Sequence, residues 1–570
     1  MSKFLTEKGR YVLAGIFLVG FAALVAPTVL HRDLMSGFFG NYSFYIILFS
    51  VLLWAYYVIA ALVESEASVK TFFVENARGL VFSILAAAVI FASVEFSFKT
   101  LSDETNLLSV SHSMSFGHKA YNVTLGKYYY GNFNPLDQPV PTRPLMFPFF
   151  TSVVTSAIGF HWYNPFVANF VSLASLYFLI FAVARRFTDE VSAVAAVIFA
   201  ASYPVISVYA VSGGFDLCSA FFFFLSLTML YHYVLAPTPS KFAMLWTTLV
   251  VFSNIRYESL LIFALVMGAL VAFLYVDWNT IKQSAAPLSA TPLIFLPFLW
   301  QRILTAGNTY ESPPGVAPFS AGNFFEHLKE FAVSQFDFKF FLPYSNVLNF
   351  FCLGAILYLA YLFVRDDELR SSRPQKHFVA IFAASFVALN GLYLTHFMGK
   401  YSHPTQARFF IVFAVVCAVS PVLLKAARPG LVSGKTLAAF AVALFVAYHP
   451  VAVENRFINT LELYREIKGQ MAFLRNVHNK NIFIVYDRPG TYASMGLGAG
   501  DFNFANGNKD GLLNELRRRL FTEIYVFQKI DYGTQLPVPE DKLDPEFHLE
   551  TLHELQVTGG NYLRISRVRL

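Results

Sequence analysis

Two acidic residues stand just beyond the end of a long apolar stretch of the sequence. The segment Thr100–Gly117 reads TLSDETNLLSVSHSMSFG and contains Asp103 and Glu104 side by side. A carboxylate at a lipid surface can accept the proton of a hydroxyl group while that hydroxyl attacks another molecule. A plainer role is open as well, because Ser102 or Asp103 could cap the helix that the following residues predict. The side of the membrane that the segment faces decides which role is reasonable.

Three arginines occupy comparable positions next to other apolar runs. Arg143 lies in TRPLMFPFF, Arg256 in NIRYESLL and Arg408 in QARFF. A guanidinium stays charged and binds phosphate through a planar fork of N–H groups, so these arginines could hold the phosphate of a lipid. The side chain of Arg143 could instead reach to the interface only to keep its charge in water. Arg256 could simply pair with Glu258.

Four further polar residues belong to the same set of candidates. Asp216 opens an apolar run after two glycines, where a helix N-cap competes with a functional role. Glu258, Lys400 and His403 are candidate accessory residues near Arg256 and Arg408. Each residue alone is a weak indication. Their shared location at the ends of several apolar runs is a stronger indication of function, because it predicts that these residues lie together in a single charged layer.

A divalent metal ion could bind the carboxylate oxygens of Asp103, Glu104 and Asp216. No compact ligand motif requires one, since His112 and His118 are poorly spaced for one face of a helix. The three cysteines are far apart in the sequence and indicate neither a disulfide framework nor a zinc cluster. We therefore expect no required cofactor and leave a metal ion open.

The composition predicts a polytopic α-helical membrane protein. Of the 570 residues, 56% are hydrophobic and only 14% are charged, whereas soluble proteins have about 25% charged residues. The net charge of +6 comes mostly from short loops between apolar runs, so it does not indicate a nucleic-acid partner. The apolar runs predict about thirteen membrane-spanning helices, at roughly 11–30, 43–63, 78–98, 165–184, 190–209, 215–235, 242–254, 258–276, 287–304, 346–364, 377–397, 409–425 and 435–450.

The distribution of lysine and arginine predicts how these helices are oriented. Basic residues gather in the short loops that share a side with the N-terminal segment MSKFLTEKGR, so we expect the N-terminus in the cytoplasm. The opposite side then carries the loops at about 99–164 and 305–345 and everything after residue 450. Within the first loop, Leu145–Phe160 is too short for a further span and predicts an interfacial or re-entrant segment. The charged layer would thus face the extracytoplasmic side of the inner membrane.

The composition changes near residue 450, which predicts a membrane domain over 1–450 and an extracytoplasmic domain over 451–570. The second domain alternates helical patterns with short apolar strands such as NIFIVY and EIYVFQ, which is typical of a small α/β fold. Between its first strand and second helix lies SMGLGAGDF. The glycine spacing does not match a dinucleotide fingerprint, so we expect a flexible loop there rather than a phosphate cradle.

In their order, these motifs resemble the polyprenyl-phosphate-sugar-dependent glycosyltransferases of the GT-C superfamily, in the branch of the aminoarabinose transferases and protein-mannosyltransferase-like proteins. The resemblance covers about residues 78–425 and is carried by SDETNLLSVSHSM, TRPLMFPFF, FAVARRF, GGFDLCSAFF and QARFF. Three features differ. Two helices precede the span before the acidic loop, where many members have one, and Arg143 stands where relatives often have lysine followed by two prolines. The helix of the acidic loop also lacks some of the usual charged positions.

The resemblance implies that Asp103 is the general base, with Glu104 as the alternative, and that Asp216 is a second functional acid. It implies that Arg143 binds the phosphate of the donor, and Arg256 and Arg408 are candidate helpers. The donor would be a polyprenyl-phosphate sugar. The acceptor would be a lipid, glycan or protein of the cell envelope, and direct displacement predicts inversion at the anomeric carbon.

Three other functions are compatible with a chain of this composition. A transporter or lipid flippase would place ionisable residues near the middle of its spans, whereas most candidates here lie at span ends, with Glu95 a partial exception. A membrane scaffold with a partner-binding C-terminal domain would leave the charged layer unexplained. A ligase that uses a diphosphate-linked glycan would remain within the enzyme class.

Overall fold

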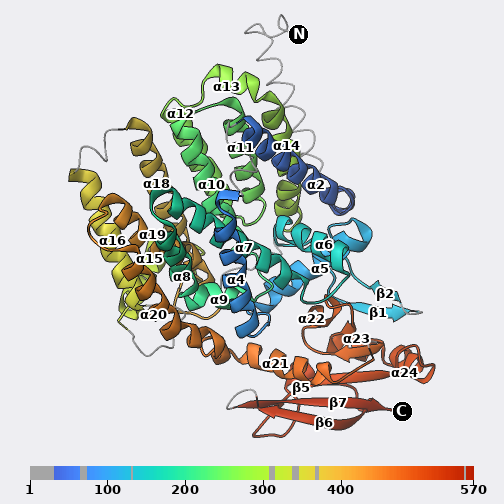
Figure 1. The fold of residues 1–570 in the computed structure, drawn as a ribbon. Helices are drawn as coiled ribbons and strands as arrows, with labels where there is room; N and C mark the ends of the chain where they lie inside the picture. Colours follow the sequence, from blue (N-terminus) through green and yellow to red (C-terminus); the bar gives the residue numbers. More distant parts are fainter. Residues whose placement is uncertain are drawn as a thin grey trace, which may run out of the picture.

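The computed structural model describes residues 31–64, 74–129, 132–306, 315–336, 346–365, 372–479, 481–556 and 560–570. These residues form a bundle of helices and, at one end of it, a mixed sheet flanked by shorter helices (Figure 1). We call that end of the bundle the sheet end. The first predicted span, 11–30, lies outside the described residues.

Seven helices in the described ranges are long and apolar enough to cross a membrane, which makes the chain an integral membrane protein. The bent pair α8 (Glu190–Ala201) and α9 (Pro204–Ala210), with axes 73° apart, can form an eighth. The predicted number of thirteen spans is therefore not confirmed. The seven are α2 (Arg32–Glu64), α7 (Asn164–Phe187), α10 (Asp216–Leu235), α16 (Asn346–Arg365), α18 (Arg373–Thr395), α19 (Ile411–Ala427) with the preceding 3₁₀ turn η1 (Ala407–Phe410), and α20 (Gly434–Val453) with its extension through η2 (Ile458–Thr460).

Other helices fill the remaining predicted runs. Each predicted run from 43–63 to 435–450 contains a helix, although several are too short or too interrupted to count as spans by themselves. The run 190–209 breaks before Pro204, which lacks the N–H that would continue the ladder. A break is also present at 254–258. Further helices of the bundle are α4 (Ala77–Ser93), α6 (Met146–Ile158), α11 (Pro239–Ser253), α12 (Ser259–Ala272), α13 (Trp278–Gln283), α14 (Ala285–Leu304) and α15 (Ala321–Ser334).

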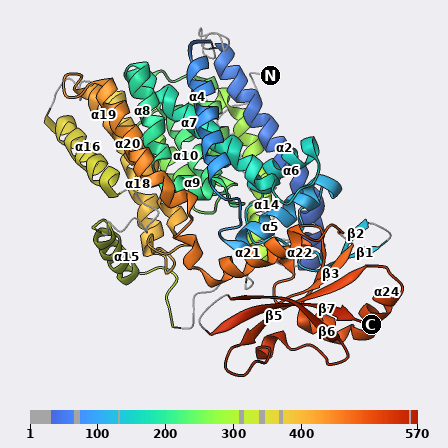
Figure 2. The ribbon, with the colours of Figure 1, turned by 60° about the horizontal axis from the view of Figure 1, so that its bottom comes forward.

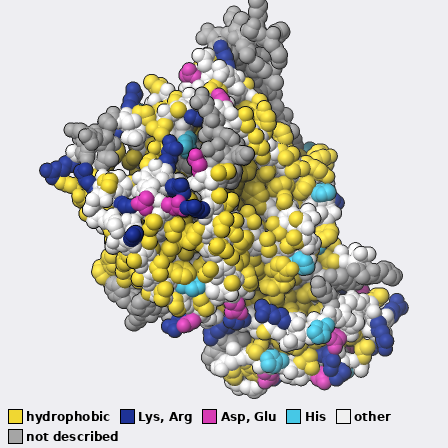
Figure 3. Space-filling model, viewed as in Figure 1, with side chains coloured by type: hydrophobic (Ala, Val, Ile, Leu, Met, Phe, Trp, Pro, Cys, Tyr) yellow, Lys and Arg dark blue, Asp and Glu magenta, His cyan; other side chains and the backbone are white. Residues whose placement is uncertain are grey.

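The outer surface of the helical bundle is apolar over a wide area. Figure 3 shows hydrophobic side chains over much of the helical bundle, with charged side chains gathered at its upper left and on the C-terminal residues at the bottom of the view. On α2, the side chains of Leu52, Tyr56, Ile59 and Val63 are all exposed. An apolar surface of this extent requires a lipid environment.

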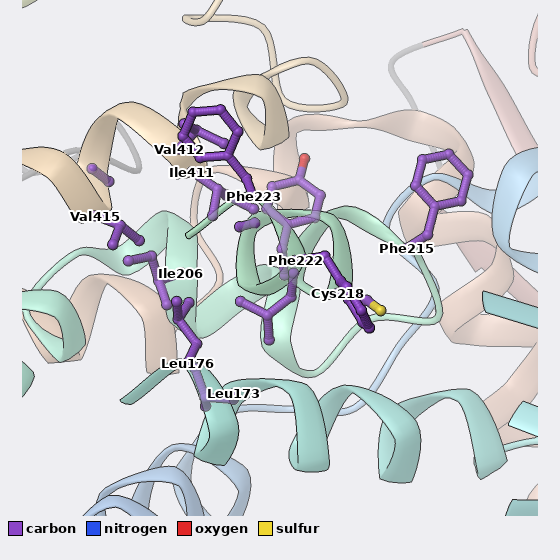
Figure 4. Close-up of a cluster of buried hydrophobic side chains, with 14 of the residues drawn as sticks. Leu173, Leu176, Ile206, Phe215, Cys218, Phe222, Phe223, Ile411, Val412 and Val415 are labelled. Carbon is purple, nitrogen blue, oxygen red and sulfur yellow. The ribbon is translucent and has the colours of Figure 1, made fainter. Parts of the chain in front are cut away.

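Packing in the interior of the bundle fixes the helix ends that carry two of the charged candidates, Asp216 and Arg408. Apolar side chains of α7, α9, α10 and α19 interlock there (Figure 4). Each fully buried side chain of this kind contributes about 1.5–3 kcal/mol. Since α10 begins at Asp216 and Arg408 lies in η1 just before α19, this packing sets the positions of both residues. The cluster includes Leu173, Leu176, Ile206, Phe222, Phe223, Ile411 and Val415.

The sheet has seven strands in the order β2-β1-β4-β3-β5-β7-β6. Strands β3, β4 and β5 are parallel to one another, and the other pairings are antiparallel. The hairpin of β1 and β2 belongs to the first long loop of the helical part, so two distant parts of the chain share this sheet. The strands are β1 (Gly126–Tyr129), β2 (Asn132–Pro135), β3 (Ile482–Val485), β4 (Gly498–Gly500), β5 (Glu523–Asp531), β6 (His548–Gln556) and β7 (Asn561–Arg569).

Both faces of the sheet are covered at its central strand β3. In β3, Ile482 and Ile484 face the cluster that includes α21 (Glu462–Arg475) and α5 (Leu101–Gly117). Phe483 and Val485 face the opposite cluster, which includes α23 (Phe502–Gly507) and α24 (Lys509–Arg517). A strand buried on both faces has a continuous apolar sequence, as IFIV does. The sheet therefore packs directly against α5, which is the helix that carries Asp103 (Figure 2).

The glycine-rich stretch was wrongly expected to be a flexible loop. Gly498–Gly500 is strand β4, and all three residues are buried beside β3. A Cβ atom on Gly498 would lie 2.8 Å from the carbonyl oxygen of Ile482, so the close approach of the two strands requires glycine at this position. A three-residue strand without large side chains gives no hydrophobic alternation from which it could be recognised.

Candidate active site

Asp103 is held between two guanidiniums in the first turn of α5. Arg143 Nε donates to Asp103 Oδ1 at 2.9 Å, and Arg408 Nη2 donates to Oδ2 at 2.9 Å. Burial raises the pKa of Asp103, but the charges and hydrogen bonds of the two arginines outweigh it and hold the pKa at about 2. The carboxylate is therefore ionised and engaged by side chains, which is a different role from helix capping.

The pairing continues beyond Asp103 as an ion-pair chain. Arg408 Nη1 lies 3.8 Å from Asp216 Oδ2, and Asp216 also pairs with Arg256. Arg256 Nε lies 3.3 Å from Glu258 Oε2. Positive and negative groups alternate, and their formal charges sum to zero. Burying charges is tolerable only when each has a partner, as it has here. In order, the ion-pair chain is Arg143, Asp103, Arg408, Asp216, Arg256 and Glu258.

The break between α11 and α12 positions the inner end of this chain. Arg256 lies in that break, and its guanidinium stands 5.0 Å from the ring centroid of Phe215 and 5.1 Å from that of Phe409. These aromatic faces attract the cation and keep water away from it. Arg256 and Asp216 are both almost fully buried. Near Arg256, the inner end of the ion-pair chain is thus packed among aromatic rings.

The backbone around Arg143 is fixed, while its side chain is partly open. Gln301 of α14 donates through Nε2 to the carbonyl oxygens of Pro141 and Arg143, each at 2.6 Å, and the Tyr257 hydroxyl donates to the carbonyl of Thr142. The Arg143 side chain is 31% exposed. It is the most accessible group of the ion-pair chain and the one best placed to exchange partners.

Glu104 binds backbone amides rather than cations. Its carboxylate accepts hydrogen bonds from the N–H groups of Thr100 at 2.8 Å, Gly213 at 2.9 Å and Lys99 at 3.0 Å. Burial raises the pKa of Glu104 to about 7, even though these amides and the charge of Lys99 favour the ionised form. Glu104 therefore ties the start of α5 to the glycine turn that precedes Asp216.

A cavity of about 1340 Å³ lies between the sheet end of the bundle and the C-terminal residues, and we call it the interdomain cavity. Glu104 and Asp216 stand behind its wall, and neither lines it. On the opposite side, the wall is made by Leu461–Tyr464 and by the turn Arg488–Thr491. Of the predicted site residues, the structure brings Asp103, Arg143, Arg256, Glu258 and Arg408 to the cavity.

Arg302 also lines the cavity, although the sequence did not single it out. It lies in the last turn of α14, and its guanidinium stands 3.9 Å from the ring centroid of Tyr257. In the described ranges it forms no ion pair with a carboxylate. Like the other arginines, it ends an apolar run next to the charged layer, and that position is the signal that could have identified it.

The structure does not bring Lys400 and His403 to the cavity. Lys400 Nζ pairs with Glu326 at 2.9 Å and with Glu330 at 3.4 Å, both on α15. His403 Nδ1 lies 3.0 Å from the hydroxyl oxygen of Thr405. The structure thus places them apart from the other candidates, because the second long loop places a helix with its own carboxylates beside Lys400.

Asp103, Glu104 and Asp216 are the three acids that the sequence suggests as metal ligands. In this arrangement they do not form a metal site. Asp103 and Asp216 are bound by guanidiniums, and Glu104 is bound by backbone amides. Across the ranges that the structure describes, no group of three or more histidine, cysteine, aspartate or glutamate side chains could hold an ion. The residues present therefore do not fit a divalent metal shared by these carboxylates.

Comparison with solved structures shows what fold the chain resembles. The chain is similar to the crystal structure of ArnT from Cupriavidus metallidurans in the apo state, with a TM-score of 0.50 and 11% identity over 86% of this chain and 98% of that chain. It is also similar to the same protein bound to undecaprenyl phosphate, with a TM-score of 0.48, 12% identity and the same coverage. For the Archaeoglobus fulgidus oligosaccharyltransferase in the apo form, the TM-score is 0.39 and the identity 12%, over 80% of this chain and 69% of that one.

No protein-family model and no curated protein matches the sequence. The fold is therefore recognised from the arrangement of helices and not from sequence identity. The chain shares the fold of this ArnT structure, in agreement with the fold that the order of motifs implied.

Proposed function

We propose that this protein is a membrane glycosyltransferase that moves a sugar from a polyprenyl-phosphate donor to a cell-envelope acceptor. The observation that carries the proposal is the contact between Asp103 and Arg143 at the interdomain cavity, where a base and a phosphate-binding cation meet at the ends of apolar helices. The GT-C fold supports a lipid-linked donor. The acceptor can be a lipid, a glycan or a protein.

In the proposed reaction, Asp103 takes the proton of an acceptor hydroxyl. The hydroxyl oxygen forms a bond to the anomeric carbon of the sugar, and the bond between that carbon and the phosphate oxygen breaks. The electron pair of the broken bond goes to the lipid phosphate, and the proton passes from Asp103 to water. One direct displacement inverts the configuration at the anomeric carbon. Within this scheme a single carboxylate facing the cavity is sufficient.

Arg143 and Arg302 are the cations best placed for the leaving phosphate. Both line the cavity, Arg143 is partly exposed, and Arg302 has no carboxylate partner in the described ranges. A phosphate monoester has a second pKa near 6, so it leaves without a dedicated acid when cations stabilise its developing charge. Arg256 and Arg408 were expected to bind the same phosphate. Carboxylates already neutralise them, and we assign them to holding Asp103 and Asp216.

Donor binding would also make Asp103 a stronger base. With both arginines in contact, the pKa of Asp103 is about 2, which is low for proton abstraction. When Arg143 turns to the phosphate, one of the two charges that lower this pKa leaves the carboxylate, and the pKa rises. Arg408 stays in place because Asp216 holds its other side. Asp103 thus becomes more basic only when the donor is bound.

The proposed orientation follows from the distribution of lysine and arginine and places this chemistry on the extracytoplasmic side of the inner membrane. The N-terminus is then cytoplasmic, residues 1–450 form the membrane domain, and residues 451–570 form an extracytoplasmic domain. Its sheet includes the hairpin of β1 and β2 from the first loop. A phosphate at headgroup depth reaches the same layer as the charged side chains.

The proposal can be tested in cells of the source organism by mass spectrometry of lipids and envelope glycans. With Asp103→Asn or Arg143→Ala at wild-type protein levels, a polyprenyl-phosphate sugar should accumulate and one envelope product should lose that sugar. The accumulated lipid would identify the donor. Unchanged lipids and unchanged envelope products in both variants would contradict the proposed function.

A further inference from the structure

The turn Arg488–Thr491 stands at the edge of the sheet where ligands commonly bind. Strand β3 pairs with β4 on one side and with β5 on the other, and all three are parallel. The chain runs from β3 to β4 and then crosses to the far side of β3, so the connections change direction at β3. In open α/β sheets, ligands bind beyond the carboxyl ends of the strands at such a switch point. Here the segment that follows β3 leads into this turn.

Arg488 is the accessible charge of that turn. Its side chain is 47% exposed, and its ion pair in the described ranges is a loose one, with Nε 3.8 Å from Asp487 Oδ2. The same carboxylate oxygen lies 3.0 Å from Lys529 Nζ, so Lys529 competes for it at the shorter distance. The guanidinium of Arg488 therefore keeps most of its hydrogen-bonding capacity for a ligand.

The turn borders the same cavity as Asp103. It continues into α22 (Gly490–Ala493), which packs against α5, and Figures 1 and 2 both show α22 between α5 and the sheet. Gly490 lies against Thr124, since a Cβ atom there would be 3.6 Å from the Thr124 Cα. Arg488, Gly490, Thr124 and Asp103 all line the interdomain cavity. A molecule bound at the turn therefore reaches the space in front of the proposed base.

The charges around the cavity are unequal. Its wall contains six basic side chains but only three acidic ones. Asp103 and Glu258 are occupied by arginines of the ion-pair chain. Two guanidiniums remain outside that chain, with Arg302 on the helical side and Arg488 on the C-terminal side. The basic residues are Lys99, Arg143, Arg256, Arg302, Arg408 and Arg488, and the acidic ones are Asp103, Glu258 and Glu462.

We propose that Arg488 binds a phosphate or carboxylate group carried by the acceptor, so that the enzyme selects an acidic acceptor. The inference rests on the proposed function and assigns the C-terminal side of the same cavity to the acceptor. The donor brings one negative charge, which Arg143 and Arg302 receive on the helical side. The acceptor brings another, which Arg488 receives on the C-terminal side, and this leaves the acceptor hydroxyl between the two.

The test compares Arg488→Gln and Arg488→Lys with Arg475→Gln, a control for an exposed arginine of α21 that does not line the cavity. Two quantities are measured with the full chain: the amount of sugar-modified product in envelope extracts, and the affinity of the purified protein for undecaprenyl phosphate. Losing a charged hydrogen bond predicts about a tenfold or greater loss of product for Arg488→Gln. The affinity for undecaprenyl phosphate should stay within about twofold of wild type, Arg488→Lys should give an intermediate amount of product, and Arg475→Gln should match wild type.

The nature of the acidic group is tested on the acceptor itself. Envelope extract from cells without the protein is treated with phosphatase or by methyl esterification and then offered to membranes that contain the wild-type protein. Loss of transfer after phosphatase identifies a phosphate, and loss after esterification identifies a carboxylate. Undiminished transfer after both treatments, or a purified acceptor that carries neither group, would overturn the inference.

The variants also separate this inference from the proposed function. Wild-type product with Arg488→Gln, or equal losses with Arg475→Gln, would overturn the role of Arg488. An equal loss of undecaprenyl phosphate affinity would overturn it too, because Arg488 would then belong to the donor side. If Asp103→Asn and Arg143→Ala also give wild-type product, the proposed function itself fails.

Discussion

Asp103 and Arg408 are 305 residues apart in the sequence, yet a hydrogen bond of 2.9 Å joins Arg408 Nη2 to Asp103 Oδ2. Another nitrogen of the same guanidinium lies 3.8 Å from Asp216. One arginine before α19 thus holds the acids that begin α5 and α10. This contact connects the first long loop to the helical core and fixes the proposed base.

Removal of Arg408 should therefore affect both folding and transfer. Arg408→Ala leaves Asp103 and Asp216 with one guanidinium each in a buried setting, and breaking a buried pair costs about 3–5 kcal/mol. We expect a lower thermal unfolding temperature in detergent and at least a hundredfold loss of sugar transfer. Arg465→Ala, at an exposed position of α21, is the control and should change neither quantity. Unfolding temperatures that match in the two variants would show that the Arg408 contacts contribute no stability.

Arg302→Ala should weaken donor binding without unfolding the protein. The Arg302 side chain is exposed to the cavity, stacks on Tyr257 and leaves no buried carboxylate unpaired when it is removed. We expect about a tenfold weaker affinity for undecaprenyl phosphate, in keeping with the loss of a charged hydrogen bond, and an unchanged unfolding temperature. Arg456→Ala removes an exposed arginine away from the cavity and serves as the control. An unchanged affinity in Arg302→Ala would remove Arg302 from the phosphate site.

Glu104→Gln should change how stability depends on pH. The pKa of Glu104 is about 7 in the folded chain against an ordinary value of 4.5. The folded state therefore binds this proton more tightly than the unfolded state, and the wild type loses stability as the pH rises from 5 to 7. Glutamine does not titrate. The unfolding temperature of the variant should therefore rise relative to that of wild type as the pH increases from 5 to 7. If the difference in unfolding temperature between the variant and wild type stayed constant between pH 5 and pH 7, the raised pKa of Glu104 would be contradicted.

Gly498→Ala should damage the sheet, and Gly511→Ala should not. An added Cβ at Gly498 meets the Ile482 carbonyl oxygen at 2.8 Å, whereas nothing lies within 4 Å of a Cβ at Gly511 in α24. Alanine at Gly511 even favours the helix, by about 0.8–1.0 kcal/mol. We expect a lower unfolding temperature for Gly498→Ala and an equal or higher one for Gly511→Ala. Hydrogen exchange in β3 and β5 should rise only in the first variant.

The sequence predicts the helices and much of the charged layer, because both depend on local patterns. Apolar runs locate the helices, and Asp103, Arg143 and Arg408 each lie next to the end of such a run. The sequence does not show which acidic side chain pairs with which basic side chain. Only the folded chain reveals that Glu104 binds backbone amides while its neighbour Asp103 binds arginines.

Other features depend on contacts between distant segments. The hairpin of β1 and β2 joins the C-terminal sheet through β4, a strand of three glycine and alanine residues with no recognisable pattern. Lys400 pairs with two acids of α15, Glu326 and Glu330, which lie 74 and 70 residues earlier in the chain. Neither pairing leaves a local signal in the sequence, so the sequence could not assign the hairpin to a sheet or show that Lys400 lies apart from the other candidates.

The most direct measurement compares sugar transfer by purified wild-type protein with that of Asp103→Asn, using the donor lipid that accumulates in cells. Asparagine keeps the size of the side chain but removes the negative charge and the proton acceptor. Transfer should fall by at least a hundredfold, in keeping with the loss of a general base, while undecaprenyl phosphate still binds. Transfer within about threefold of wild type would show that Asp103 is not the base and would contradict the account.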